Sequence, residues 1–168
     1  AGPAGLSCAY FLALMGYAPT IFEKNAEPGG MLRYGIPSYK LEKDLLAAEI
    51  DVIKALGVTI RCNVEIGKDI TIEELKQQGY AGFYLAIGCQ EGRKPGIAGQ
   101  DAKGCVTAVE FLREAGAKEA YTLHGDVVVV GGGNVAIDAA RISTRCTDAK
   151  VSMVCMEDRD HMPASDEE

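Results

Sequence analysis

Hydrophobic and polar positions follow two patterns along this chain, one typical of helices and one typical of strands. Apolar residues recur at helical spacing from Leu45 to Leu56, and Gly57 then provides a favourable helix end. Short apolar runs bounded by Gly, Pro and polar residues predict strands. The predicted helices cover residues 4–15, 41–56, 71–78 and 106–115, with a fifth that ends near residue 145. The predicted strands cover residues 20–23, 58–62, 83–87, 126–130 and 150–156.

Alternation of strands and helices predicts an α/β fold with a parallel sheet. We expect two Rossmann-like dinucleotide-binding units with three-layer parallel-sheet architecture, at residues 1–95 and 126–168. A connector and helix at 96–125 join them, because residues 90–104 are rich in Gly. Both units are expected to be incomplete: the first lacks a strand before its glycine turn, and the second stops after two strands.

The segments between these elements also carry predictions. Residues 25–39 are rich in Gly and Pro and are expected to form a loop. Thr71 and Glu74 have the spacing of a capping box, which predicts a helix N-terminus. The run 83–87 is apolar throughout and predicts a buried strand, whereas residues 118–125 are polar and 157–168 are charged without periodicity.

Composition excludes several function classes. The chain is 48% hydrophobic and 24% charged, and it has no apolar run of membrane-spanning length. The formal net charge is −7 with Lys and Arg scattered, whereas nucleic-acid binding favours a basic stripe. We therefore expect a cytoplasmic protein with no nucleic-acid partner and no membrane association. The six cysteines lack metal-ligand spacing, which favours reduced structural thiols over cluster ligands or a redox pair.

A complete dinucleotide-binding pattern follows the strand predicted at 126–130. Residues 131–136 read Gly-Gly-Gly-Asn-Val-Ala, which is G-x-G-x-x-A. Gly131 permits the tight turn, Gly133 lets the backbone approach a pyrophosphate, and Ala136 allows close packing of helix on strand. The helix N-terminus presents free N–H groups and a positive dipole end to phosphates. The pattern predicts a bound dinucleotide, and a glycine turn without a ligand is the alternative.

A second pattern of this kind opens the chain. Residues 1–5 read Ala-Gly-Pro-Ala-Gly, which is G-x-G-x-x-G without its first glycine. Glu23 ends the next predicted strand, where an acid accepts hydrogen bonds from a ribose. Residues 28–31 add flexible backbone, and Gly88 either returns the chain to the same pyrophosphate or forms an ordinary turn. Two such turns predict an enzyme that brings two dinucleotides together.

Glu157 ends the strand that follows the second turn. A carboxylate there accepts hydrogen bonds from the adenosine ribose hydroxyls and repels a 2′-phosphate, which favours NADH over NADPH. A solvated surface charge is the alternative, and the neighbouring Arg159 would still meet a phosphate.

Several stretches together resemble the small-subunit family of glutamate synthase. The flavin–nicotinamide part of dihydropyrimidine dehydrogenase and several electron-bifurcating flavoproteins are similar. The resemblance is carried by AGPAGLS at 1–7, IFEK at 21–24, PGGMLRYGIP at 28–37, GGGNVAIDAAR at 131–141 and MPAS at 162–165. It implies a flavin-dependent oxidoreductase with FAD in residues 1–95 and NAD(P)H in 126–168, which transfers hydride from NAD(P)H to FAD.

The resemblance also implies which residues bind the cofactors. The residues implied for FAD are Gly2, Pro3, Gly5, Glu23, Lys24, Gly30, Met31 and Leu32, with Ile36 and Gly88 near it. Those implied at the NAD(P)H turn are Gly133, Asn134, Val135 and Asp138, beside the Gly131 and Glu157 discussed above. Hydride transfer between the cofactors needs no general acid or base, so we predict no catalytic side chain and no metal ligand.

The chain departs from the family pattern at one informative place. The family usually has two arginines where this chain has Met156 and Glu157, which puts NADPH in doubt and supports NADH. The family's cysteine-rich iron–sulfur segment does not occur in these residues. The resemblance therefore implies that FAD passes electrons to iron–sulfur centres in a missing segment, or in a partner such as a large catalytic subunit.

Two other functions remain open from the sequence. A single-Rossmann NAD-dependent dehydrogenase would need a catalytic Tyr/Lys or His constellation, and the pair Tyr34 and Lys40 has the wrong context for that. A non-catalytic nucleotide-binding module would keep the fold without turnover. Residues 1–168 by themselves are not expected to be active.

Overall fold

The computed structural model describes residues 1–118 and 120–167. Glu119 and Glu168, which belong to the predicted polar segment and charged tail, lie outside the described residues. The chain divides into two compact units. The first unit holds Ala1–Arg33 and Ser38–Cys89, and the second holds Tyr34–Pro37 and Gln90–Glu168.

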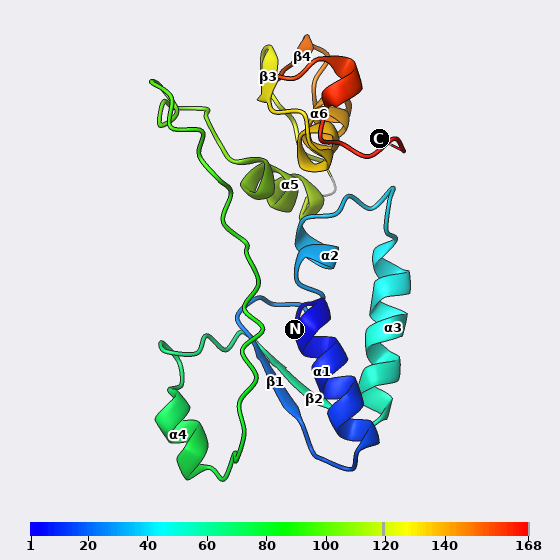
Figure 1. Cartoon of the computed structure of the whole chain (residues 1–168), viewed down its shortest axis with the longest axis vertical. Coiled ribbons are helices and arrows are strands. Elements are labelled where there is room, and N and C mark those ends of the chain that lie inside the picture. The colour runs from blue at the N-terminus through cyan, green and yellow to red at the C-terminus, as the bar shows by residue number, and fades with distance from the viewer. Residues whose placement is uncertain (119, 168) are drawn as a thin grey trace. The chain divides into compact units, whose positions relative to one another are not determined.

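The first unit is built around two parallel strands. The chain runs through α1 (Pro3–Leu14), β1 (Thr20–Glu23), α2 (Met31–Tyr34), α3 (Lys43–Ala55), β2 (Thr59–Cys62) and α4 (Ile72–Gln77). β1 and β2 pair in parallel, with Thr20 opposite Thr59 and Glu23 opposite Cys62. The helices α1 and α3 lie side by side along this strand pair (Figure 1).

The core of the first unit lies between the two long helices and one face of the strands. Leu6 of α1 packs against Leu46 and Ile50 of α3, and Ile21 and Ile60 of the strands close this cluster. Side chains alternate between the faces of a strand, so Phe22 and Arg61 are directed to the opposite face. There the Arg61 guanidinium lies 5.8 Å from the centre of the Phe22 ring.

Replacing Ile50 tests this core. Ile50 is 2% exposed, so Ile50→Ala leaves a cavity and is expected to lower the free energy of unfolding by about 3 kcal/mol. Val52 lies on the same helix but is 58% exposed, so Val52→Ala is expected to change it by less than about 0.5 kcal/mol. Urea denaturation of the two variants measures the difference, and equal losses would contradict the assignment of the core.

The second unit contains another parallel strand pair and two packed helices. Its elements are α5 (Ala108–Gly116), β3 (Val127–Val130), α6 (Asn134–Cys146), β4 (Val151–Val154) and the short 3-10 helix η1 (Arg159–His161). β3 and β4 pair in register from Val127 opposite Val151 to Val130 opposite Val154. Phe111 and Leu112 of α5 pack with Ala139 of α6 and the half-buried Val129 of β3.

Most predicted elements are present with ends within a few residues. The helix starts at 71 and 107 are well defined, because Thr71 and Thr107 each form a complete capping box with Glu74 and Glu110. The prediction of an α/β fold with parallel strands is confirmed. No helix within the described part of the chain is both long and apolar enough to cross a membrane.

Two predicted segments are wrong. Residues 83–87 do not form a buried strand: they have no regular structure, and Leu85 and Ile87 are 74% and 83% exposed. A strand needs a neighbour for its backbone hydrogen bonds, and among the described residues the strands pair only as β1–β2 and β3–β4. The predicted loop at 25–39 contains the helix α2.

Candidate functional site

The first glycine turn leads directly into α1. Gly2 is the N-cap residue of this helix and Pro3 occupies its first turn, where the missing proline N–H costs no hydrogen bond. The Gly2 carbonyl accepts a hydrogen bond from the Leu6 N–H at 3.0 Å. A Cβ on Gly5 would lie 3.4 Å from Ala86, so this position permits close packing.

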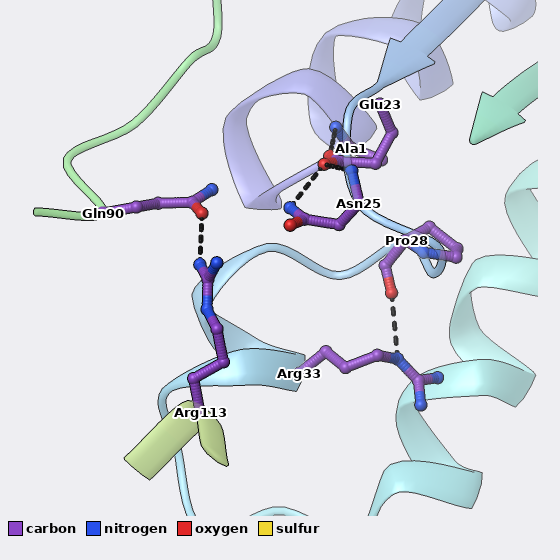
Figure 2. Close-up of polar contacts among 7 residues, drawn as sticks. All are labelled: Ala1, Glu23, Asn25, Pro28, Arg33, Gln90 and Arg113. Carbon is purple, nitrogen blue, oxygen red and sulfur yellow. Dashed lines mark hydrogen bonds and ion pairs between the residues drawn. The ribbon is translucent and has the colours of Figure 1, made fainter. Parts of the chain in front are cut away.

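Glu23 ends β1 beside this turn and is buried, with 6% of its surface exposed. Its Oε2 accepts a hydrogen bond from the Ala1 nitrogen at 2.6 Å. Its Oε1 accepts from the Asn25 backbone N–H at 2.9 Å and from Asn25 Nδ2 at 2.7 Å, as Figure 2 shows. Burial by itself raises the pKa of Glu23, but the hydrogen bond and positive charge of the Ala1 terminal ammonium, together with the hydrogen bonds from Asn25, outweigh burial and hold the pKa below its usual value.

The lowered pKa of Glu23 predicts a pH dependence of stability. The folded pKa lies below the ordinary value of 4.5, so the stabilisation is complete above pH 4.5 and is lost as the pH falls through the lower folded pKa. We expect Glu23→Gln to flatten this part of the acid limb in denaturant titrations of the 168-residue chain. An unchanged acid limb in Glu23→Gln would show that the carboxylate is not stabilised in this way.

The loop at residues 28–30 contacts the first glycine turn directly. The Gly29 N–H donates to the Ala1 carbonyl at 2.8 Å. A Cβ on Gly30 would lie 2.7 Å from the Gly2 Cα, and Gly30 has a φ of +55°, which favours glycine. The backbones of the two glycines therefore pack closely against each other, and a larger residue at position 30 would disrupt this contact.

Charged side chains hold this loop in place. Arg33 Nε donates to the Pro28 carbonyl at 3.0 Å (Figure 2), and its guanidinium pairs with Glu27 at 2.6 Å. Lys43 Nζ donates to the Leu32 carbonyl at 2.8 Å. Partial burial, and to a lesser degree the nearby Arg33 charge, lower the pKa of Lys43.

The other residues predicted for FAD lie in different surroundings. Met31 and Leu32 begin α2, where Leu32 packs on the core of the first unit, while Lys24 is exposed. Gly88 is also exposed, and a Cβ there would meet nothing within 4 Å. Ile36 lies in Tyr34–Pro37, which belongs to the second unit.

Arg113 on α5 contacts the segment Tyr34–Pro37 through the ring of Tyr34. Its guanidinium lies 5.3 Å from the centre of the Tyr34 ring, and its Nη2 donates to Gln90 Oε1 at 2.6 Å (Figure 2).

The second glycine turn connects β3 to α6. Gly131 has a φ of +131° and its N–H donates to the Val154 carbonyl at 2.8 Å. Gly133 is the N-cap of α6, and a Cβ there would meet nothing within 4 Å, so the backbone is open to approach. Asn134 and Val135 are exposed in the first turn of the helix, whereas Asp138 is buried.

Glu157 lies beyond the end of β4 and is exposed. Its carbonyl accepts a hydrogen bond from the Cys155 thiol at 3.3 Å. The carboxylate is therefore free to meet a ligand from solvent without the desolvation cost that a buried charge carries.

Three contacts near the turns were missed by sequence reasoning. Asn25 binds Glu23, Gly29 binds Ala1, and residues 164–165 bind the second glycine turn. The Pro-Gly-Gly sequence at 28–30 gave a signal for Gly29, since a doublet of glycines marks backbone with positive φ. The contact of Asn25 with Glu23 spans only two residues. The contact of residues 164–165 with the turn joins distant segments and leaves no mark in local spacing.

The polar groups described at the two glycine turns are backbone N–H groups and carboxylates, which bind ligands and are not nucleophiles for covalent catalysis. Among residues 1–118 and 120–167, no cluster of three His, Cys, Asp or Glu side chains is placed to hold a metal ion. Burial raises the pKa of the Cys62 and Cys146 thiols, which disfavours their reactive thiolate forms.

Comparison with solved structures supports the fold. FprA from Mycobacterium tuberculosis, in a structure described as a complex with NADPH, superposes with a TM-score of 0.77. The match has 20% sequence identity and covers 98% of this chain and 44% of FprA. At this identity the likeness concerns the fold alone.

Curated relatives are more similar in sequence. The NADP(+)-dependent formate dehydrogenase subunit beta of Moorella thermoacetica is 47% identical and covers 98% of this chain. The NAD-dependent dihydropyrimidine dehydrogenase subunit PreT of Escherichia coli O157:H7 is 40% identical over 100% of the chain. The glutamate synthase [NADPH] small chain of Escherichia coli K12 is 32% identical over 98% of it. The predicted resemblance to the last two groups is confirmed.

The chain spans 24%, 40% and 37% of the lengths of these three relatives, in the same order. Residues 1–168 match the model of one family, described as pyridine nucleotide-disulphide oxidoreductase. This match covers both glycine turns and both strand pairs. The chain therefore belongs to the pyridine nucleotide-disulphide oxidoreductase family.

Proposed function

We propose that this chain forms part of a flavin-dependent oxidoreductase that takes hydride from NAD(P)H, with FAD at the first glycine turn and the nicotinamide nucleotide at the second. The supporting observation is that each turn opens a helix, α1 or α6. An acid also lies near the end of each next strand: Glu23 is the last residue of β1, and Glu157 lies beyond β4. This repeated arrangement suits two dinucleotides.

The first turn fits the pyrophosphate of FAD. Gly2 and Gly30 approach so closely that a Cβ on Gly30 would lie 2.7 Å from the Gly2 Cα. A phosphate approaching here would therefore meet only backbone atoms of these two residues. Free N–H groups at the start of α1 favour an anion there. Pro3, Gly5 and Glu23 would hold the adenosine half, while Lys24, Met31, Leu32, Ile36 and Gly88 would contact the rest of the cofactor.

The second turn fits NAD(P)H for the same physical reasons. The N-terminus of α6 is open at Gly133, and α6 is long enough to contribute a substantial dipole. Gly131, Gly133, Asn134 and Val135 would hold the pyrophosphate, with the buried Asp138 supporting the turn from inside. When bound, the two cofactors supply the hydride transfer from nicotinamide C4 to flavin N5. The chain's part is to bind and orient them.

The proposed domain organisation follows from this assignment. Residues 1–95 contribute to the FAD domain, 96–125 form a connector and helix, and 126–168 contribute to the NAD(P) domain. Each domain is proposed as a three-layer Rossmann-like unit. Exposed Val128 and Val130 on β3 support a further layer on that face of the strand pair, since apolar strand faces are normally covered.

NADH is the proposed donor. Glu157 is exposed three residues beyond the end of β4, where its charge would accept from ribose hydroxyls and repel a 2′-phosphate. The names of the relatives include both an NADP(+)-dependent and an NAD-dependent enzyme, so the family accommodates either nucleotide.

An iron–sulfur protein or a large catalytic subunit is the proposed electron acceptor. Relatives are named as a subunit beta and a small chain, which supports the presence of a partner subunit. A cytoplasmic complex without nucleic acid or membrane association suits the acidic chain.

Flavin content provides the first test. The protein at its natural length is purified and heat-denatured, and the released flavin is identified by fluorescence and chromatography. We expect about one FAD per chain. A protein free of flavin would favour a single-Rossmann dehydrogenase or a non-catalytic module.

A further inference from the structure

Residues 162–165, which we call the strap, return from η1 to the second glycine turn. The Ala164 N–H donates to the Gly132 carbonyl at 3.1 Å, and the Ser165 N–H donates to Asn134 Oδ1 at 2.8 Å. Met162 also packs here, since its Cε lies 3.4 Å from where a Cβ on Gly132 would be. The strap therefore contacts both the backbone and a side chain of the turn.

The bond from Ser165 fixes the orientation of the Asn134 amide. A backbone N–H is a donor and can meet only the carbonyl end of an amide, so Oδ1 has to face Ser165. The two N–H donors of Nδ2 then point to the other side of the amide. Within the described residues no acceptor binds Nδ2, and Asn134 is exposed at the first position of α6.

We propose that Ser165 is a positioning residue whose backbone N–H holds the Asn134 amide with Nδ2 directed at the pyrophosphate of the bound nicotinamide nucleotide. The inference rests on the proposed function, in which the turn at 131–136 binds NAD(P)H. With Oδ1 held by the strap, Nδ2 donates to a phosphate oxygen. If the strap bond is lost, the amide is free to rotate and to present Oδ1, which repels that oxygen.

Variants of the strap test this arrangement without changing the turn. Ser165→Pro removes the N–H donor, whereas Ser165→Ala keeps it and serves as the matched control. NAD⁺ binding to the protein at its natural length is measured by calorimetry, which reports the nucleotide without turnover. We expect Kd to rise about tenfold in Ser165→Pro and to stay unchanged in Ser165→Ala, because one hydrogen bond to a charged phosphate is weakened.

A second variant covers the case in which Ser165→Pro fails to fold. Asn134→Asp keeps an acceptor for the Ser165 N–H, and an acid at this position suits the helix N-terminus, but it removes the Nδ2 donor. We expect weaker NAD⁺ binding by tenfold or more, with hydrogen–deuterium exchange at Ser165 still slow. If the strap had only a structural role, Asn134→Asp would change the hydrogen–deuterium exchange at Ser165 together with NAD⁺ binding.

The outcomes separate the inference from the function on which it rests. Unchanged Kd in both Ser165→Pro and Asn134→Asp, with normal binding by the wild type, would overturn the role of the strap alone. Absence of NAD⁺ binding in the wild type would overturn the proposed function and the strap with it.

Discussion

Gly30→Ala is expected to abolish FAD binding. The added Cβ would lie 2.7 Å from the Gly2 Cα and 3.4 Å from the Gly2 nitrogen, distances that force the loop or the turn to move. The φ of +55° adds strain for any residue with a Cβ. In the proposed site the turn approaches a pyrophosphate through backbone alone, so either movement would remove the binding surface. The measurement is FAD content of the purified variant, expected below about a tenth of the wild-type value.

Gly57→Ala provides the matched control for backbone strain. Gly57 also has a positive φ, of +92°, but a Cβ there would meet nothing within 4 Å. Gly57→Ala is expected to lose about 1 kcal/mol of stability from backbone strain alone and to keep its FAD, whereas Gly30→Ala loses more because its Cβ also meets the Gly2 backbone. A Gly30→Ala protein with full flavin content would show that this contact does not form the cofactor site.

Exchange of the charge at Glu157 is expected to change the nucleotide preference. Replacing the carboxylate by an amide removes repulsion of the 2′-phosphate, and replacing it by a guanidinium adds attraction. The kcat/KM ratio of NADPH to NADH is expected to rise about tenfold in Glu157→Gln and about a hundredfold in Glu157→Arg, about 1.4 kcal/mol for each step. Initial-rate kinetics with an artificial electron acceptor give this ratio.

Glu49→Arg controls for net charge, because Glu49 is an exposed acid on α3 of the first unit. Glu49→Arg makes the same change in total charge as Glu157→Arg and is expected to leave the kcat/KM ratio of NADPH to NADH unaltered. An equal shift in both variants would attribute the effect to the overall field of the protein.

Local signals predicted much of the fold from the sequence. Of the apolar residues at helical spacing from Leu45 to Leu56, Leu46, Ile50 and Ile53 lie on the core face of α3, whereas Leu45 and Leu56 are exposed. Thr71 with Glu74 marked a helix start. Such features depend on residues a few positions apart, so a single sequence contains them.

Features that depend on distant partners were not predictable in this way. The apolar run at 83–87 has the composition of a buried strand, but strand formation depends on a neighbour that spacing does not specify. The glycine turns were found because their pattern is local. The contacts of Gly30 with Gly2 and of Ser165 with Asn134 join segments that only folding brings together.

Anaerobic reduction of the protein at its natural length tests most directly whether one enzyme binds both FAD and a nicotinamide nucleotide and transfers hydride between them. Oxidised flavin absorbs at about 450 nm, and the loss of this band after mixing with NADH or NADPH reports hydride transfer. We expect rapid bleaching by NADH and much slower bleaching by NADPH. Faster bleaching by NADPH would contradict the role of Glu157, and a flavin band that neither nucleotide bleaches would contradict hydride transfer from NAD(P)H to FAD.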